Sequence, residues 1–422
     1  MSWSVKWRLG AMMFLQYAIW GAWAAVLGAY LGLPPDQKAN PDFYLSFSPI
    51  QVGIIFSLLP LATVIAPFIF GQIADRLVST QYLLSFCHIV GGAAIIAMAF
   101  QRSYGPFMWL MLAFSLLYAP TLALTNSLAF AHMRDSEKEF GGIRVWGTLG
   151  WIAAGLLLTA WRSWLPQMPG DLLLLSGGFA VLLGLFSLAL PKTPPKREGA
   201  NPLAFLEALK LFRNTNFTVF MIISFIVGTE LEFYYILTSP FMEHLGFNPA
   251  KLPAVMAIAQ IAELSVMAIA LPRLLPKLGA RKLLAMGAIA WPIRYAIFAF
   301  LPVNWLVAAS LSLHGFCYVF FFVVGFIYVD QIAPKDIRAS AQALVAIVVL
   351  GLGRFLGSRF AGFIQNEFTT KSKAMVNGVL SDVSVTNWHN VFIVPCVMTV
   401  ICALAFVLFF KDVKAEAKVE AQ

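Results

Sequence analysis

The sequence predicts an all-α integral membrane protein with about twelve transmembrane helices. Of its 422 residues, 60% are hydrophobic and only 12% are charged, whereas soluble globular domains carry about 25% charged residues. A water-soluble fold could not bury so much apolar surface. A bilayer-spanning helix needs about 20 apolar residues, so a chain of this length with short loops has room for about a dozen spans and no separate soluble domain.

The individual spans are predicted from apolar runs that are bounded by charged residues or by Pro and Gly clusters. The first run, residues 9–31, is longer and more aromatic than the apolar region of a signal peptide, which has about 7 to 15 residues. We therefore expect this run to be retained as the first helix. The other predicted helices are residues 50–74, 82–100, 106–131, 143–161, 171–190, 216–241, 252–272, 283–300, 305–329, 342–363 and 388–410.

One linker divides the predicted helices into two sets of six. Residues 191–199 are rich in proline and lysine, and an amphipathic stretch follows from Pro202 to Phe212. The sequence therefore predicts an N-terminal six-helix bundle at 1–190, a cytoplasmic linker with an amphipathic helix at 191–215, a C-terminal six-helix bundle at 216–410 and a cytoplasmic tail at 411–422.

The formal net charge of +9 is explained by membrane topology. If both termini are cytoplasmic, 19 of the 29 Lys and Arg residues lie in cytoplasmic segments, 6 lie on the opposite side and 4 lie within helices. Cytoplasmic loops of membrane proteins carry such an excess of basic residues. We therefore expect a multi-pass protein of the cell (inner) membrane with both termini in the cytoplasm, and no nucleic-acid partner.

The sequence contains no motif for a cofactor, a metal ion or an enzymatic nucleophile. The four cysteines lie in apolar segments without zinc-type spacing, so we interpret them as buried thiols. There is no H-E-x-x-H, no Gly-x-Ser-x-Gly and no P-loop. We expect neither an enzyme nor a bound cofactor, and an ATP-driven pump would need its P-loop from a separate subunit.

A short loop motif predicts the superfamily. Residues 71–76 read GQIADR, similar to the Gly-x-x-x-Asp-Arg signature of the major facilitator superfamily, and residues 278–282 (LGARK) are a degraded copy in the second half. Parallel repeats of six helices would produce this pattern. Asp75 and Arg76 are then predicted gating residues, because an Asp at a helix end can pair with a basic group across the two halves. The alternative is a pair of solvated loop charges.

Four further stretches lie in predicted helices of both halves. They are QYAIWGAW at 16–23, IRVWGTLGW at 143–151, QIAE at 260–263 and GFIYVD at 325–330. Together they resemble the nucleoside:proton symporter family of that superfamily. The resemblance implies secondary active import of nucleosides by proton symport and alternating access, with nucleoside, protons and the lipid bilayer as partners. The alternative within the fold is transport of another small polar solute, such as a sugar.

Charged residues at membrane depth are costly, so each one suggests a functional site. Gln260 and Glu263 are three residues apart and share one helix face. The amide can bind a base edge, and the carboxylate can accept bonds from sugar hydroxyls or carry a proton, because burial disfavours its charged form. We predict that both residues bind substrate and that Glu263 is the main proton-coupling residue. A helix-packing hydrogen-bond network is the alternative.

Two glutamates lie near the middle of the predicted helix at 216–241. Glu230 and Glu232 are about 200° apart around the helix, so both cannot face one cavity, and we expect one to pair with an arginine. Glu232 shares its face with Tyr235 and Ser239. Glu232 and Tyr235 are therefore the predicted substrate contacts, with Glu232 a second candidate for proton coupling and Glu230 assigned to structure.

Arg144, Thr148 and Trp151 lie on one face of the predicted helix at 143–161, at i, i+4 and i+7. The resemblance implies that this face carries binding and gating contacts. The alternative is an arginine that reaches the membrane interface beside an aromatic belt.

His314 and Tyr318 are four residues apart, which stacks an imidazole and a phenol on one face that suits a planar base. The alternative is a satisfied buried histidine. The resemblance leads us to expect a second acidic residue next to Tyr318, but the chain has Val319 there. Coupling then rests on Glu263 and a glutamate of residues 216–241, or the protein is not a proton symporter of the usual kind.

Overall fold

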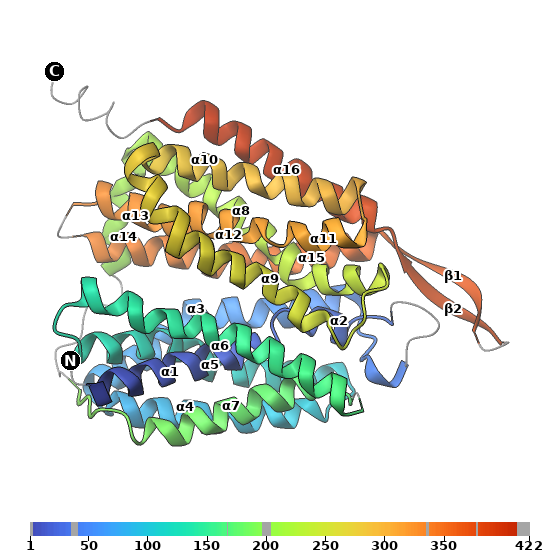
Figure 1. The fold of residues 1–422 in the computed structure, drawn as a ribbon, viewed down its shortest axis with the longest axis horizontal. Helices are drawn as coiled ribbons and strands as arrows, with labels where there is room; N and C mark the ends of the chain where they lie inside the picture. Colours follow the sequence, from blue (N-terminus) through green and yellow to red (C-terminus); the bar gives the residue numbers. More distant parts are fainter. Residues whose placement is uncertain are drawn as a thin grey trace.

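The computed structural model describes residues 3–34, 41–166, 168–195, 204–334, 337–376 and 379–411. Long helices run side by side along one axis, and those formed by the first 190 residues lie in a different group from those formed after residue 215 (Figure 1). The helices of the first group are α1 (Trp3–Gly21), α2 (Leu27–Leu31), α3 (Pro49–Arg76), α4 (Thr80–Ala99), α5 (Tyr104–Ala131), α6 (Ser136–Trp164) and α7 (Asp171–Ser187), with a short 3-10 turn at Pro41–Phe43.

The second group contains helices that are joined by π-helical segments. A π turn holds one more residue than an α turn, and such turns frequently occur at functional sites. The π segments are Val266–Ala270, Tyr318–Val323 and Ala346–Gly353. The α-helices are α8 (Thr215–His244), α9 (Leu252–Ser265), α10 (Leu271–Phe300), α11 (Asn304–Ser310), α12 (Leu313–Cys317), α13 (Val324–Ile332), α14 (Arg338–Val345), α15 (Arg354–Glu367) and α16 (Trp388–Phe409).

Nine helices within the described ranges are long and apolar enough to cross a membrane. One of them, Leu252–Phe300, has 49 residues. At 1.5 Å per residue it would span about 74 Å, more than twice the thickness of the hydrocarbon core. It is interrupted at Gly279, whose φ of 74° and ψ of 167° are not helical, so it supplies two crossings rather than one. The integral membrane class is confirmed, and the number of twelve spans stays a prediction.

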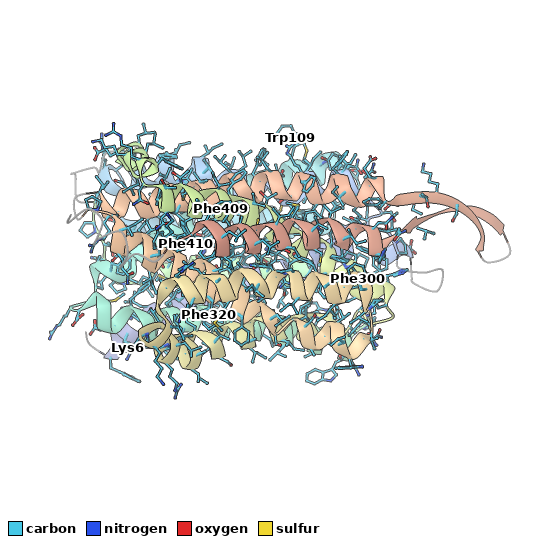
Figure 2. All side chains as sticks on the ribbon, turned by 90° about the horizontal axis from the view of Figure 1, so that it is seen from above. Lys6, Trp109, Phe300, Phe320, Phe409 and Phe410 are labelled. Carbon is cyan, nitrogen blue, oxygen red and sulfur yellow. The ribbon has the colours of Figure 1, made fainter. Side chains whose placement is uncertain are left out.

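Apolar side chains cover the outside of the bundle. Trp109 is 64% exposed and Phe409 is 62% exposed, and Trp109 projects from the rim in Figure 2. Such large apolar residues rarely gather on the surface of a soluble monomer. This surface therefore suits contact with lipid.

Three local features differ from the predicted elements. The first predicted helix is broken, because residues 22–26 form turns between α1 and α2, and α6 begins at Ser136 rather than at residue 143. The predicted amphipathic linker helix is a 3-10 helix at Ala204–Arg213.

A β-hairpin projects from one end of the bundle and was not predicted (Figure 1). Strands β1 (Thr369–Val376) and β2 (Val379–Thr386) are antiparallel, with Thr369 paired to Thr386. The signal was present in the sequence, because the two residues between the strands are Asn377 and Gly378, a dipeptide typical of two-residue hairpin turns. These two residues lie outside the described ranges.

Candidate functional site

A cavity of about 350 Å³ lies between the two groups of helices. This volume falls within the range of small-molecule binding sites. Residues from both groups line the cavity, so a bound molecule would touch both. The first group contributes Tyr17, Trp20, Asn126, Arg144, Thr148 and Trp151, and the second contributes Tyr235, Gln260, Glu263, Tyr318 and Arg354, together with smaller and apolar residues.

Close packing of α1 against α6 positions the aromatic face of the first group. A Cβ atom on Gly150 would lie 2.0 Å from the backbone carbonyl oxygen of Phe14, so this position must be glycine for the helices to approach. Trp151 then packs edge-on against Trp20, with ring centroids 5.2 Å apart. The guanidinium of Arg144 lies 4.0 Å from the centroid of the Tyr17 ring. On the predicted face of α6, Arg144 and Trp151 thus line the cavity, and each contacts an aromatic ring of α1.

Gln260 and Glu263 both line the cavity from α9, as their spacing predicts. The side-chain oxygens of Gln260 and Asn126 have no hydrogen-bond partner in the described part of the chain. Such free acceptors are costly unless a ligand or water satisfies them. The cavity therefore offers two amide groups, one from each group of helices, for polar groups of a bound molecule.

Glu263 belongs to α9 and lines the cavity between the two groups of helices. The Arg144 guanidinium attracts its carboxylate electrostatically across the cavity. A Cβ atom on Gly315 would lie 2.6 Å from the backbone of Ala262, so the glycine lets α12 pack directly on α9. This contact brings Tyr318 to the same wall of the cavity as Glu263.

Glu232 does not line the cavity but holds a residue that does. Its Oε1 atom lies 2.5 Å from Nε of Arg354, and the Ser358 hydroxyl donates to its Oε2 at 2.9 Å. The Arg354 guanidinium lies 5.2 Å from the centroid of the Tyr235 ring and faces the cavity. The expectation that one of the two neighbouring glutamates pairs with an arginine is confirmed.

His314 also lies behind the cavity wall. It is fully buried and stacks on Tyr318, with ring centroids 5.7 Å apart, and on Tyr234, with centroids 4.7 Å apart. Only Tyr318 of these three rings lines the cavity. Val319 is fully buried and lies outside the lining.

The predicted gating residues lie at the end of α3, away from the cavity lining. Arg76 is exposed, and the side chain of Asp75 lies outside the described part of the structure. Among the lining residues, the sequence did not assign a binding role to Tyr17, Trp20 or Asn126. An uncharged residue in an apolar helix gives no sign of whether it lines a cavity or packs against a neighbouring helix. Arg354 carried such a signal, because an arginine at membrane depth suggests a functional site.

The two groups of helices touch at the end where α3 begins and α15 ends. A Cβ atom on Gly53 would lie 2.6 Å from the Ser358 carbonyl oxygen and 3.1 Å from Gly362 Cα, so α3 and α15 are in direct backbone contact. Gly28 of α2 is packed against Ile236 of α8 in the same way. Each of these two contacts requires a glycine on at least one of the two helices that touch.

Hydrogen bonds reinforce this end. The Tyr44 hydroxyl donates to Glu243 Oε2 at 3.1 Å, and the Arg162 guanidinium donates to the Pro249 carbonyl at 3.2 Å. Arg162 is itself fixed by two bonds of 2.7 Å to Asp171. The two groups of helices are therefore in direct contact at the end opposite to Arg76.

Known proteins resemble the chain along nearly its whole length. Residues 3–415 match the family model described as Nucleoside H+ symporter. The chain is 34% identical over 421 residues to the putative nucleoside transporter YegT of Escherichia coli (strain K12), covering 96% of this chain and 93% of that protein. It is 28% identical over 429 residues to the nucleoside permease NupG of the same organism, covering 97% and 96%.

Solved structures agree with these sequence matches. A crystal structure of the nucleoside transporter NupG matches with a TM-score of 0.81 and 26% identity, covering 97% of this chain and 99% of that one. The crystal structure of a D-xylose-proton symporter matches with a TM-score of 0.69 and 14% identity, covering 97% and 98%, and shares the fold alone. The predicted major facilitator fold is confirmed.

Proposed function

Because the chain belongs to the nucleoside H+ symporter family, we propose that it imports nucleosides together with protons across the inner membrane. The observation that carries this proposal is the cavity between the two groups of helices, where two amides, two arginines and one carboxylate face a space the size of a small-molecule site. The chain is a transporter and not an enzyme.

The chemistry of the cavity suits both parts of a nucleoside. Trp151 and Tyr318 offer aromatic faces to a planar base. The Gln260 amide can form paired hydrogen bonds with a base edge, and Glu263 can accept bonds from the ribose hydroxyls. Arg144 and Thr148 complete the contacts from α6, and Glu232 acts by holding Arg354 in place.

Transport proceeds by alternating access of two halves, residues 1–190 and 216–410, joined by the linker at 191–215. The basic excess of the loops supports a topology with both termini and the Arg76 end of α3 in the cytoplasm. In that topology, the glycine contacts between the two groups of helices lie on the outer side of the membrane. Asp75 and Arg76 lie on the cytoplasmic side, where they gate the closing of the halves on that face.

Glu263 couples nucleoside movement to protons. Its carboxyl lines the cavity, where it can take up a proton from one side and release it to the other when the halves exchange access. Arg144 of the opposite half attracts the ionised carboxylate, so the approach of the two halves changes the balance between the protonated and ionised forms.

Uptake of labelled uridine into cells that overproduce the protein tests the proposal. Unlabelled purine and pyrimidine nucleosides should compete for uptake, whereas free bases and sugars such as ribose or xylose should compete weakly. Competition by sugars alone would overturn the assignment of nucleosides as substrates.

A further inference from the structure

A second cluster of buried polar side chains lies in the C-terminal half, behind the cavity. It combines one carboxylate, one guanidinium and one imidazole with three aromatic side chains, and each member is at most 1% exposed. None of its members lines the cavity. We call these residues the rear cluster; they are Glu230 and Tyr234 of α8, Trp291, Arg294 and Tyr295 of α10, and His314 of α12.

Aromatic rings surround the cation of the rear cluster. The Arg294 guanidinium lies 4.5 Å from the Trp291 ring centroid, 4.6 Å from that of Tyr234 and 5.1 Å from that of Tyr295. Its Nη1 atom lies 3.4 Å from Nδ1 of His314. A guanidinium can only donate, so Nδ1 accepts and the imidazole is neutral. Electron-rich ring faces stabilise a buried cation even when no carboxylate touches it.

The carboxyl of Glu230 forms no hydrogen bond of normal geometry within the described part of the chain. The Tyr295 hydroxyl is near enough to act on the carboxyl, but it donates its hydrogen bond to the Glu230 backbone carbonyl at 3.0 Å. Arg294 attracts this carboxyl electrostatically but forms no hydrogen bond with it. A buried ionised carboxylate without partners is strongly disfavoured, so the neutral carboxylic acid is the form that fits this geometry.

The chain treats its other buried arginine–carboxylate pairs differently. Arg162 and Asp171 are joined by two hydrogen bonds, and Arg354 contacts Glu232 directly with Ser358 as a second donor. In both arrangements the carboxylate accepts direct charge-assisted hydrogen bonds. Glu230 is two residues from Glu232 on the same helix, yet its oxygens remain free beside a cation that is held by rings.

We propose that Glu230 is a proton-binding carboxyl of the transport cycle, in addition to Glu263. This proposal rests on the proposed proton-coupled import. When the carboxylate accepts a proton it becomes a carboxylic acid, and the rings hold Arg294 alone. When a path toward the cavity opens and the acid releases that proton, the carboxylate pairs with Arg294. The proton is the only species exchanged, and the cluster keeps a stable arrangement in both forms.

Glu230 carries the only carboxyl group of the rear cluster. Tyr295 and Arg294 act on it from α10, Cys317 from α12 and Cys402 from α16. The phenol and the thiols are neutral acids that are far weaker than a carboxyl group. Arg354 of α15 is already bound by Glu232. No second carboxyl of the described residues shares the site, so protonation of Glu230 decides the charge of the cluster.

One stacked pair of rings links the rear cluster to the cavity. His314 contacts Arg294 on one side and stacks on Tyr318, which lines the cavity. Tyr318 is also the first residue of the π-helical segment Tyr318–Val323, and π turns frequently occur at functional sites. A nucleoside that displaces Tyr318 therefore moves His314 against Arg294 and opens a path for the proton.

The variant Glu230→Gln in proteoliposomes tests the proposal. Counterflow of labelled uridine, which needs no proton gradient, should stay within about twofold of wild type. Accumulation driven by an imposed pH gradient should fall to the level seen without a gradient. Glu207→Gln is the control, because it neutralises an exposed carboxyl of the linker that belongs neither to the cavity lining nor to the rear cluster. Accumulation by Glu230→Gln at the wild-type level would overturn the proposal.

Two further measurements keep the result decisive. If Glu230→Gln alone does not fold, the double variant Glu230→Gln with Arg294→Gln removes both charges and should also exchange uridine without accumulating it. Infrared spectroscopy of the purified protein should show the C=O band of a buried protonated carboxyl that Glu230→Gln removes. This band does not depend on the substrate, so the two proposals can fail separately. If wild-type protein shows no uridine counterflow, nucleoside transport is refuted. If the band is unchanged in Glu230→Gln, proton binding by Glu230 is refuted.

Discussion

Each half of the protein buries a polar cluster, and the two clusters are built differently. In the N-terminal half, Gln16 donates to the Thr121 hydroxyl at 2.8 Å, and its side-chain oxygen lies 2.9 Å from Nε2 of His88. The Tyr118 hydroxyl donates to the Gln16 backbone carbonyl at 2.7 Å. Both polar atoms of the Gln16 side chain are thus satisfied. In the C-terminal half, the carboxyl of Glu230 has no hydrogen-bond partner among the described residues.

This difference indicates a division of tasks between the halves. A complete hydrogen-bond network fixes one arrangement of α1, α4 and α5, because any movement would leave a buried polar group unpaired. An incomplete network can hold or release a proton without breaking bonds. We therefore expect the N-terminal half to present Trp151 and Arg144 from the more fixed side of the cavity, and the proposed proton-binding groups lie in the C-terminal half.

The largest effect is expected from Glu263→Gln in the C-terminal half. The variant keeps the shape of the side chain but fixes it in a neutral form. Accumulation of uridine under a proton gradient should be lost, while exchange should survive with weaker binding, because the carboxylate no longer accepts bonds from the ribose. Uptake and counterflow in proteoliposomes measure the two effects. Wild-type accumulation by this variant would place coupling elsewhere and would weaken the division between the halves.

The next largest effect concerns binding residues on either side of the cavity. Trp151→Ala and Gln260→Ala should each weaken nucleoside binding by about 10- to 100-fold, which corresponds to about 1.4–3 kcal/mol. Calorimetry on purified protein measures the affinity. Trp109→Ala is the control, because this residue is 64% exposed on the outer surface. Unchanged affinity in both cavity variants would remove them from the binding site.

The next effect is smaller and concerns stability: substitutions in the two buried polar clusters should lower the unfolding free energy by different amounts. Gln16→Ala breaks two interhelical hydrogen bonds, and each such bond in a membrane protein contributes about 0.6 kcal/mol on average and 1.7 kcal/mol at most. We expect a loss of about 1–3 kcal/mol in unfolding free energy, with proton coupling retained. Glu230→Gln removes no hydrogen bond of the carboxyl and should melt closer to wild type. Thermal unfolding in detergent measures the stability of both variants. A larger loss of stability in Glu230→Gln than in Gln16→Ala would contradict the difference between the two clusters.

The smallest effect is expected at the end of α3 that carries Asp75 and Arg76. Asp75→Ala should slow uridine transport several-fold while changing the affinity less, because a gating residue shifts the balance of conformations without touching the substrate. Transport rates and calorimetric affinities should be measured on the same preparation. A parallel loss of both in a folded variant would argue against a gating role.

The sequence predicted features that depend on a single helix. The shared face of Gln260 and Glu263 and the stacking of His314 on Tyr318 follow from helical spacing, and both are present. Spacing also required Glu230 and Glu232 to face different surroundings. It could not assign Arg354 to Glu232, because that choice depends on how α15 is rotated against α8.

Other features left a weak signal or none. Residues 22–26 interrupt the first helix although they contain neither Gly nor Pro, so only the packing of the halves reveals the break. The β-hairpin had a turn signal, but its strands contain charged and small residues that resemble an ordinary loop. The π segments beside the cavity have no composition that separates them from regular helix.

Proton movement that accompanies nucleoside movement is the most direct test of the account. Wild-type proteoliposomes with no imposed gradient should take up protons when uridine is added outside, as reported by a pH-sensitive dye trapped inside. The account predicts an acidification that depends on uridine and is absent in Glu263→Gln. Entry of labelled uridine without any change in internal pH would contradict proton-coupled import.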